Sequence, residues 1–360
     1  MNERHRILLR TIPFIAIGLL IFVLYLVLFV NIPQMIAVIQ RTNMLVYSLA
    51  ALALILATFL FTLTWQHLLL PLSVEISIKK AFAYVWIGVF TDLLIPAESV
   101  SGEIAKTYLM SKEPNANPGK VIASLVCQRM LGTITTTAIL FIGFLALLAL
   151  NYSMTGLMLQ ILVLMAIVSA VALGFLVAVC IKEKWTERLV ITIMSFVERV
   201  SRGRFKLEHL QTKIIDALRA FYESLRTFGS EPAKLLPAII FNVLSWLFSI
   251  AVVFLVFVSI DYLGIDIPTL LVKVAIVYTL LVAIKSIPIG VPAEVGLPDI
   301  VMTTLFILFG IPPDVSAAAT VLSRILTVWL SFFIGFVAVQ WFGVRSLMES
   351  GVFGRTKDTV

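Results

Sequence analysis

Residues 96–103 read Pro-Ala-Glu-Ser-Val-Ser-Gly-Glu and follow directly on the apolar run Ala81–Ile95. Pro96 cannot continue a helix, so a helix that enters through this run ends there. A second helix can begin a few residues later, with Ser99 or Ser101 as its N-cap. Fifteen helical residues reach only about 22 Å, which is less than the core of a bilayer at about 30 Å. The stretch therefore predicts a helical hairpin that turns back within the depth of a membrane.

The chain repeats this arrangement. Pro96-Ala97-Glu98 recurs as Pro292-Ala293-Glu294, 196 residues later, and Phe141-Ile142-Gly143-Phe144 recurs at 333–336. Between these two matches lies a third, since Ala123-x-x-Val126-x-x-Arg129 recurs as Ala318-x-x-Val321-x-x-Arg324 at an offset of 195. Three matches in the same order at nearly constant offset indicate an internal repeat. Each unit reads as a span, a broken hairpin with Pro-Ala-Glu at its tip, and a long helix that carries one arginine.

The amino-acid composition indicates whether these helices lie in water or in a membrane. Of 360 residues, 61% are hydrophobic and 13% are charged, whereas soluble domains have about 45–50% apolar and about 25% charged residues. A soluble enzyme and a disordered chain are both excluded, because neither could accommodate so much apolar surface. The sequence predicts an all-α integral membrane protein. Six runs are long enough to be full spans: Thr11–Val30, Met44–Leu63, Val121–Leu150, Leu157–Ile181, Leu235–Ile260 and Asp314–Phe342.

The basic residues predict the orientation, because Lys and Arg accumulate in cytoplasmic loops. Basic side chains occur near both termini, and eleven lie in 182–234. The connections 151–156 and 261–268 contain no Lys or Arg. With both termini in the cytoplasm, the first tip segment must enter and leave from the cytoplasm and the second from outside. A pair of full spans in each place would also satisfy this condition, but the fifteen-residue run Ala81–Ile95 argues against it. We therefore expect two re-entrant hairpins and inverted-topology repeats, the plan of many secondary transporters.

The whole chain, 1–360, reads as a single polytopic domain. Repeat unit one covers about 44–150 and repeat unit two about 235–342. Between them, 182–234 is the one sizeable polar segment. From Leu207 its apolar residues recur every three or four positions, which predicts an amphipathic helix. A cytoplasmic connector against the membrane surface is favoured over a module that binds a partner.

Charged side chains at membrane depth mark a candidate site, because each costs about 2.5–3.5 kcal/mol to insert. The N-termini of the second hairpin helices present free N–H groups that favour phosphate, and an arginine can bind phosphate through two hydrogen bonds. The predicted phosphate-binding residues of a lipid headgroup site are Arg129, Arg324, Ser99, Ser101 and Gly102. Residues predicted to balance charge, or to bind a cation or proton, are Glu98, Glu103, Glu294, Asp92 and Asp299.

A purely structural role stays open for these charges. Glu98 with Arg129, and Glu294 with Arg324, can form ion pairs that hold each hairpin to the next helix. Lys106, Lys285 and Asp299 fit interfacial or pairing roles better than a ligand site.

Catalytic signals are poor. His5, His67 and His209 have no metal-binding spacing, and the sequence has no Gly-x-Ser-x-Gly elbow and no phosphate-binding loop of ATPases. We therefore expect no catalytic residues, no metal and no cofactor, and a protein that is not an enzyme. A membrane transferase that uses Glu98, Glu103 or Asp92 remains an alternative.

Residues 96–103, followed by Ala123-Ser124-x-Val126-x-x-Arg129, resemble the first signature of the lysylphosphatidylglycerol synthase transmembrane-domain family. This family includes the UPF0104 and flippase-like membrane proteins. Pro288-Ile289-Gly290-x-x-Ala293-Glu294, then Leu322-x-Arg324, resembles the second signature. The resemblance covers essentially the whole chain. It departs at Val100-Ser101-Gly102-Glu103, where the family often has a glycine or arginine before Gly-Glu.

The resemblance implies movement of a phosphate-containing polar lipid between leaflets, such as an aminoacylated phospholipid or a polyprenyl-phosphate sugar. It makes lipid synthesis doubtful, because no soluble transferase domain accompanies these helices. Its implied partners are membrane lipids, and a separate lipid synthase or glycosyltransferase; no nucleic acid is implied. The alternatives are a membrane-embedded lipid-modifying transferase and a partner subunit of such an enzyme. The expected location is the plasma membrane of a prokaryote.

Overall fold

The computed structural model describes residues 20, 23–95, 100–113, 116–152, 155–188, 191–192, 208–262, 266–285 and 296–349, and side chains in all of these except 208–213 and 343–349. These residues form an all-helical protein, with no strand among them. Both Pro-Ala-Glu tips lie outside the described residues, and with them Glu98, Ser99 and Glu294. Most of the predicted span Thr11–Val30 also lies outside them.

The first half of the chain contains α2 (Ile32–Gln40), α3 (Met44–Leu69) with a 3₁₀ turn at Leu70–Leu72, α4 (Ile78–Leu94), α5 (Val100–Met110), α6 (Pro118–Ala149) and α7 (Gly156–Ile181). The second half contains α9 (Glu208–Ser230), a 3₁₀ turn at Pro232–Leu235, α10 (Leu236–Ser259), α11 (Ile267–Lys285), α12 (Leu297–Leu308), α13 (Pro313–Arg324) and α14 (Ser331–Glu349). A short π-helical turn, Ile325–Leu330, joins α13 to α14.

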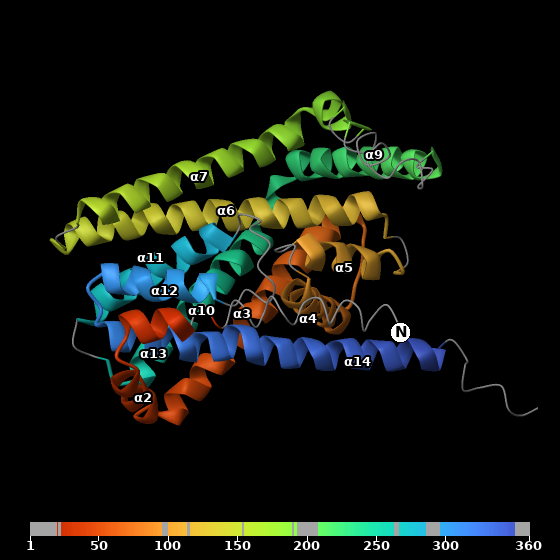
Figure 1. Ribbon diagram of the computed structural model, residues 1–360. Coiled ribbons are helices and arrows are strands. Elements are labelled where there is room, and N and C mark those ends of the chain that lie inside the picture. The colour runs from red at the N-terminus through yellow and green to blue at the C-terminus, as the bar shows by residue number, and fades with distance from the viewer. Residues whose placement is uncertain are drawn as a thin grey trace, which may run out of the picture.

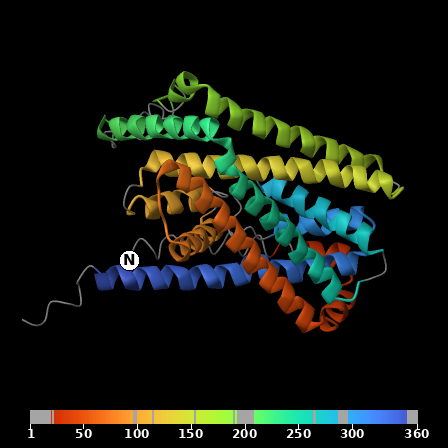
Figure 2. The ribbon, with the colours of Figure 1, turned by 180° about the vertical axis from the view of Figure 1, so that it is seen from behind.

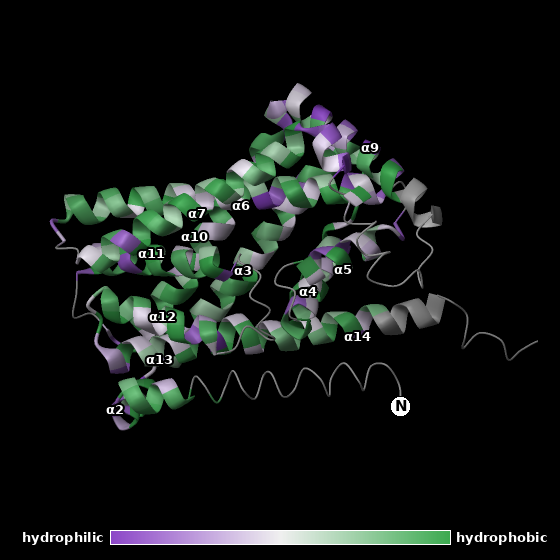
Figure 3. Ribbon diagram, turned by 45° about the horizontal axis from the view of Figure 1, so that its top comes forward, coloured by the Kyte–Doolittle hydropathy of each residue, from purple (hydrophilic) through white to green (hydrophobic). Residues whose placement is uncertain are grey.

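Six helices of the described chain are long and apolar enough to cross a membrane: Met44–Leu72, Pro118–Ala149, Gly156–Ile181, Pro232–Ser259, Ile267–Lys285 and Pro313–Phe342. Five of them contain most of a span predicted from the sequence. The sixth, Ile267–Lys285, precedes the second Pro-Ala-Glu tip and overlaps the apolar run 269–287, which as the entering arm of the second predicted hairpin was not counted among the six spans. Its 19 residues reach about 28 Å, close to the full bilayer core. Figure 3 shows that apolar residues cover these helices and that hydrophilic residues gather near α9.

Helices α4 and α5 form an antiparallel hairpin. Near its tip, Asp92 on α4 accepts hydrogen bonds from Ser101 and Gly102 on α5. Near its base, Lys80 donates to Glu113 at 2.8 Å. The two backbones approach closely between these ends, because a Cβ at Gly102 would lie 2.5 Å from the carbonyl oxygen of Gly88. Only a glycine fits at this crossing.

The two hairpins lie beside opposite halves of α6 (Figure 1). Helices α4 and α5 lie along its N-terminal half, and α11 and α12 along its C-terminal half, as the reverse view also shows (Figure 2). The α14 helix packs on α4, where a Cβ at Gly335 would meet the Phe90 side chain at 2.6 Å. Helix α3 packs on α10, and Ser245 donates to the Ala57 carbonyl across that contact at 2.9 Å. The described residues of the two repeat units thus share one core.

The amphipathic helix α9 has its partner within the chain. Phe221, Tyr222 and Phe228 are buried in a cluster with Val121 of α6. Gly119 provides the close approach, since a Cβ there would overlap the carbonyl oxygen of Ala217. The sequence periodicity predicted the helix correctly. Its apolar face packs on α6, because α6 extends far enough to cover it. The placement of this segment against the membrane surface stays a prediction.

The hairpin crossing can be tested by adding one methyl group. Gly102→Ala should lower the free energy of unfolding by about 1–3 kcal/mol, because the new Cβ would crowd the Gly88 carbonyl and the Asp92 carboxylate. Thermal unfolding in detergent measures the loss. Gly174→Ala in α7 is the matched control, because a Cβ there meets nothing within 4 Å. Equal melting temperatures for the two variants would contradict the tight crossing.

The base of the hairpin predicts a pH dependence. Burial by itself raises the pKa of Glu113, but hydrogen bonds from Lys80 and Tyr84 and the charge of Lys80 outweigh it, so the pKa lies below its ordinary value. A carboxyl whose pKa is lowered by folding stabilises the fold above its unfolded pKa of about 4.3. This contribution should disappear as the pH falls from there through the folded pKa.

Melting temperatures between pH 3 and pH 7 check this expectation. Glu113→Gln should cost about 1 kcal/mol near pH 7 and should remove part of the acid-induced loss. Glu75→Gln, at an exposed carboxylate, should leave the profile unchanged. If Glu113→Gln and the unmodified protein had parallel profiles, the Lys80–Glu113 contact would not stabilise the fold.

Candidate functional site

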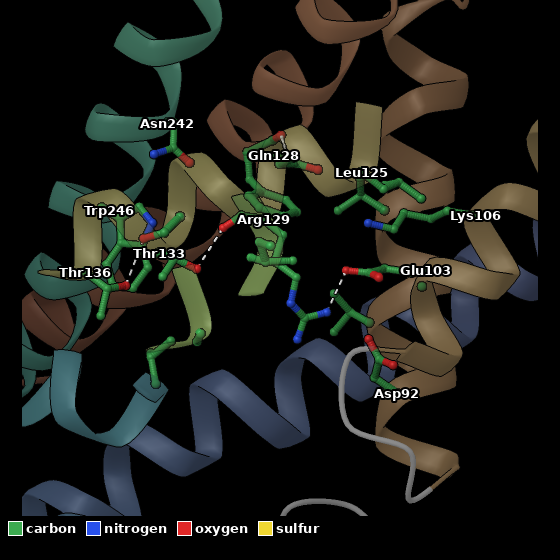
Figure 4. A pocket seen from close by; sticks show the side chains of 18 of the residues that line it. Asp92, Glu103, Lys106, Leu125, Gln128, Arg129, Thr133, Thr136, Asn242 and Trp246 are labelled. Atoms are coloured by element: carbon green, nitrogen blue, oxygen red, sulfur yellow. Dashed lines mark hydrogen bonds and ion pairs between the residues drawn. The ribbon is translucent and has the colours of Figure 1, made fainter. Parts of the chain in front are cut away.

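A cavity of about 500 Å³ lies between the α4–α5 hairpin and the helices α3, α6, α7, α10 and α11. Four charged side chains line it: Asp92 from α4, Glu103 and Lys106 from α5, and Arg129 from α6. Figure 4 shows Arg129 extending from α6 toward Glu103, with Lys106 and Asp92 beside them. The hairpin thus places charged groups of both signs at the wall of one cavity.

Arg129 and Glu103 form an ion pair with an Nη1–Oε1 distance of 3.0 Å. Their side chains are 31% and 32% exposed. Each of these side chains has room for a further contact on the cavity side, because a guanidinium has five donors and a carboxylate several acceptor positions.

Lys106 is buried, with 7% of the residue exposed. Its ammonium lies 5.4 Å from the ring centroid of Trp65 and 5.7 Å from that of Phe61, distances at which aromatic faces attract a cation. The sequence suggested an interfacial or pairing role for Lys106. Its spacing of three residues from Glu103 is a signal that could have found it, because residues i and i+3 share one face of a helix.

The carboxylate of Asp92, on α4, lies at the N-terminus of α5 and accepts hydrogen bonds there. Its Oδ1 accepts hydrogen bonds from Ser101 Oγ and from the Gly102 backbone N–H, both at 2.6 Å. The sequence predicted that Ser101 and Gly102 would offer these groups to a ligand phosphate. In the structure a carboxylate of the chain already accepts both hydrogen bonds, because α4 ends beside the first turn of α5. A phosphate would have to displace Asp92 to bind there.

The second repeat unit contains a corresponding ion pair. Arg324 Nε donates to Asp299 Oδ1 at 2.8 Å, and Asp299 Oδ2 accepts from the Gly296 N–H at 2.6 Å. Asp299 stands 196 residues after Glu103, and Arg324 stands 195 after Arg129, which are the offsets of the repeat. The sequence had suggested Glu98 and Glu294 as the arginine partners, and both lie outside the described residues. Within the described chain, Glu103 and Asp299 hold the arginines.

The two ion pairs differ in their surroundings. Arg324 and Asp299 are 7% and 4% exposed and do not line the cavity, whereas Arg129 and Glu103 do. The structure therefore brings together Asp92, Glu103 and Arg129 of the predicted site, with Lys106 added. It places Arg324 and Asp299 apart, in a buried contact between α12 and α13. Among the described residues, no group of three His, Cys, Asp or Glu could hold a metal ion.

Comparison with known proteins places these helices in context. The family model described as the lysylphosphatidylglycerol synthase TM region matches residues 15–335. A UPF0104 membrane protein of Methanothermobacter thermautotrophicus is 25% identical over 301 residues, which cover 83% of this chain and 86% of the relative. A UPF0104 membrane protein of Pyrococcus horikoshii is 22% identical over 241 residues, covering 66% and 71%. A third, from Methanocaldococcus jannaschii, is 26% identical over 245 residues, covering 67% and 70%. No solved structure matches the chain.

The difference between the two ion pairs predicts different costs for the same substitution. Arg324→Gln should lower the free energy of unfolding by about 3–5 kcal/mol, because it leaves the buried Asp299 without its charge partner. Arg129→Gln should cost about 1 kcal/mol or less, because water can reach both partners. Denaturant unfolding in detergent compares them. Similar losses for both variants would mean that the Arg129 pair is as structural as the Arg324 pair.

Proposed function

Because the chain belongs to the lysylphosphatidylglycerol synthase TM-region family, we propose that it is a lipid translocase of the plasma membrane. It moves a phosphate-containing polar lipid from one leaflet to the other. The headgroup passes through the cavity while the hydrocarbon chains stay in the bilayer. An aminoacylated phospholipid and a polyprenyl-phosphate sugar both have the required chemistry.

The proposal includes the topology. The N- and C-termini lie in the cytoplasm, α4–α5 is a re-entrant hairpin from that side, and α11–α12 enters from outside as its inverted counterpart. Three observations support it. Basic residues gather in 182–234 and near the termini, and the two hairpins lie beside opposite halves of α6. The 17 residues of α4 begin with a turn that contains Lys79 and Lys80, which leaves an apolar stretch shorter than an ordinary span.

The observation that carries the proposal is the pair of cations at one wall of the cavity. Arg129 and Lys106 stand beside Asp92 and Glu103 among largely apolar helices, where a charge is costly unless it has a polar partner or a task. Arg129 is partly exposed to the cavity. A lipid phosphate could accept two hydrogen bonds from its guanidinium, and the Lys106 ammonium would lie beside the same anion. Glu103 would then exchange its bond to Arg129 for a donor on the headgroup or for a proton.

An apolar groove beside the cavity fits the rest of a lipid. About 380 Å³ of space lies between α5 and α6, lined by apolar side chains that include Val100, Ile104 and Ile122. Glu103 and Leu125 line both this groove and the cavity. An amphiphile could therefore place its phosphate in the cavity and one hydrocarbon chain in the groove.

Leaflet exchange in proteoliposomes tests the function. Fluorescent phospholipid in the inner leaflet is protected from a membrane-impermeant reductant, and the rate at which it becomes accessible measures translocation. Arg129→Gln should lower this rate at least about tenfold, because one charged hydrogen bond to phosphate is worth roughly 1.5–3 kcal/mol. Arg219→Gln is the matched control, because Arg219 lies on α9 with its side chain 73% exposed.

Thermal unfolding of each variant separates loss of exchange from loss of fold. Full exchange by a folded Arg129→Gln variant would defeat the assignment of this cavity. Absence of exchange by the unmodified protein, with formation of a new lipid from a labelled donor, would favour a membrane-embedded transferase. Absence of exchange and of product would favour a subunit that acts with a separate synthase.

A further inference from the structure

The cavity has a second end that carries no charge. Thr133 and Thr136 of α6 and Asn242 and Trp246 of α10 line it, on the side away from Glu103 and Lys106 (Figure 4). A headgroup whose phosphate lies at Arg129 would extend its remaining atoms toward these residues. Their hydrogen-bonding state therefore indicates which headgroup the cavity can take.

Asn242 is buried, with 1% of the residue exposed, and its amide is oriented by a chain of two hydrogen bonds. Thr135 Oγ1 donates to the Leu131 carbonyl at 2.8 Å, so it can only accept from Asn242, whose Nδ2 lies 2.9 Å away. The Oδ1 atom is consequently turned away from Thr135. It is buried and has no hydrogen-bond partner in the described part of the chain. A buried acceptor left unsatisfied is destabilising, and a bound donor would remove that cost.

The two cavity-lining threonines also present acceptors. Thr133 Oγ1 donates to the Arg129 carbonyl at 3.0 Å, and Thr136 Oγ1 donates to the Gly132 carbonyl at 2.9 Å. Each hydroxyl proton is therefore used within α6, and the oxygen retains a lone pair. The wall of the uncharged end thus contains the unsatisfied Oδ1 of Asn242 and the hydroxyl oxygens of Thr133 and Thr136, beside the aromatic surface of Trp246. It calls for a ligand group that donates several hydrogen bonds.

Hydroxyl groups and ammonium groups both donate, and charge decides between them. Among the described residues that line the cavity, the carboxylates are Asp92 and Glu103. Both lie at the charged end, where Asp92 accepts from Ser101 and Gly102 and Glu103 pairs with Arg129. An ammonium at the uncharged end would be buried without a counter-charge, which is far costlier than burying a hydroxyl that is hydrogen-bonded.

We propose that Asn242, Thr133, Thr136 and Trp246 form a subsite for a neutral, polyhydroxylated headgroup, such as glycerol, inositol or a sugar, attached to the phosphate held near Arg129. This inference rests on the proposed function for the lipid to which the headgroup belongs. The subsite itself can be tested without transport, because soluble headgroup phosphates contain the groups that it recognises.

Calorimetric titration of the purified protein in detergent gives the test. The probes are inositol 1-phosphate, which carries hydroxyls, and phosphoethanolamine, which carries an ammonium. The unmodified protein should bind inositol 1-phosphate at least about tenfold more tightly. Asn242→Leu should remove that advantage, since one hydrogen bond to a buried acceptor accounts for about a factor of ten. Asn242→Asp should reverse the preference, because a carboxylate at this position would pair with the ammonium.

Substitutions of two neighbouring threonines test the subsite while leaving the Asn242–Thr135 hydrogen bond in place. Thr136→Val should weaken binding of inositol 1-phosphate several-fold. Thr137→Val should leave it unchanged, because Thr137 bonds to the Thr133 carbonyl and does not line the cavity. Equal affinity of the unmodified protein for both probes, unaltered in Asn242→Leu and Thr136→Val, would overturn the subsite and leave Asn242 Oδ1 as an acceptor for water only.

The two proposals fail in different ways. Selective binding of inositol 1-phosphate together with no leaflet exchange would support the subsite and refute translocation. Leaflet exchange at equal rates for phosphatidylinositol and phosphatidylethanolamine, together with equal binding of the two soluble probes, would support translocation and refute the subsite.

Discussion

In each half of this protein, an arginine on a long helix pairs with a carboxylate in the first turn of a neighbouring short helix. Arg129 pairs with Glu103, and Arg324 pairs with Asp299. The buried Arg324–Asp299 pair tolerates the loss of neither charge, whereas the Arg129–Glu103 pair is partly exposed. In both units the contact brings the short helix against the long one. The position of the cavity follows from this constraint, because the Arg129–Glu103 contact brings α5 against α6 at the cavity wall.

The two pairs occupy the same places in the sequence repeat but have different surroundings. In the second unit Asp299 also accepts from the Gly296 N–H at the start of its own helix, and the pair is buried. In the first unit that capping role belongs to Asp92, on the preceding helix. Glu103 pairs instead with Arg129, at the edge of an open space. Because two carboxylates divide these tasks, the first pair can face the cavity while the hairpin stays capped.

The sequence was informative where a strong physical constraint acts on neighbouring residues. Long apolar runs predicted five of the membrane-crossing helices, and Pro96 predicted the break after α4. The charge partners of the arginines were harder to predict from the sequence, because Glu98 and Glu103 both lie near the same tip. Spacing alone does not choose between them. Lys106 was assigned an interfacial or pairing role, because nothing local reveals Trp65 and Phe61 beside it. The packing of α9 was missed for a similar reason, since an apolar stripe does not say whether lipid or protein will cover it.

The π-helical turn Ile325–Leu330 separates two contacts made by one continuous helical rod. Before the turn, Arg324 is bound to α12; after it, Gly335 is pressed against Phe90 of α4. A widened turn changes the angular phase of every residue that follows, so the rod can present matched faces to two neighbours that a regular helix would not serve at once. One helical rod therefore connects the hairpins of the two repeats, and its change of phase lies immediately beyond a buried arginine.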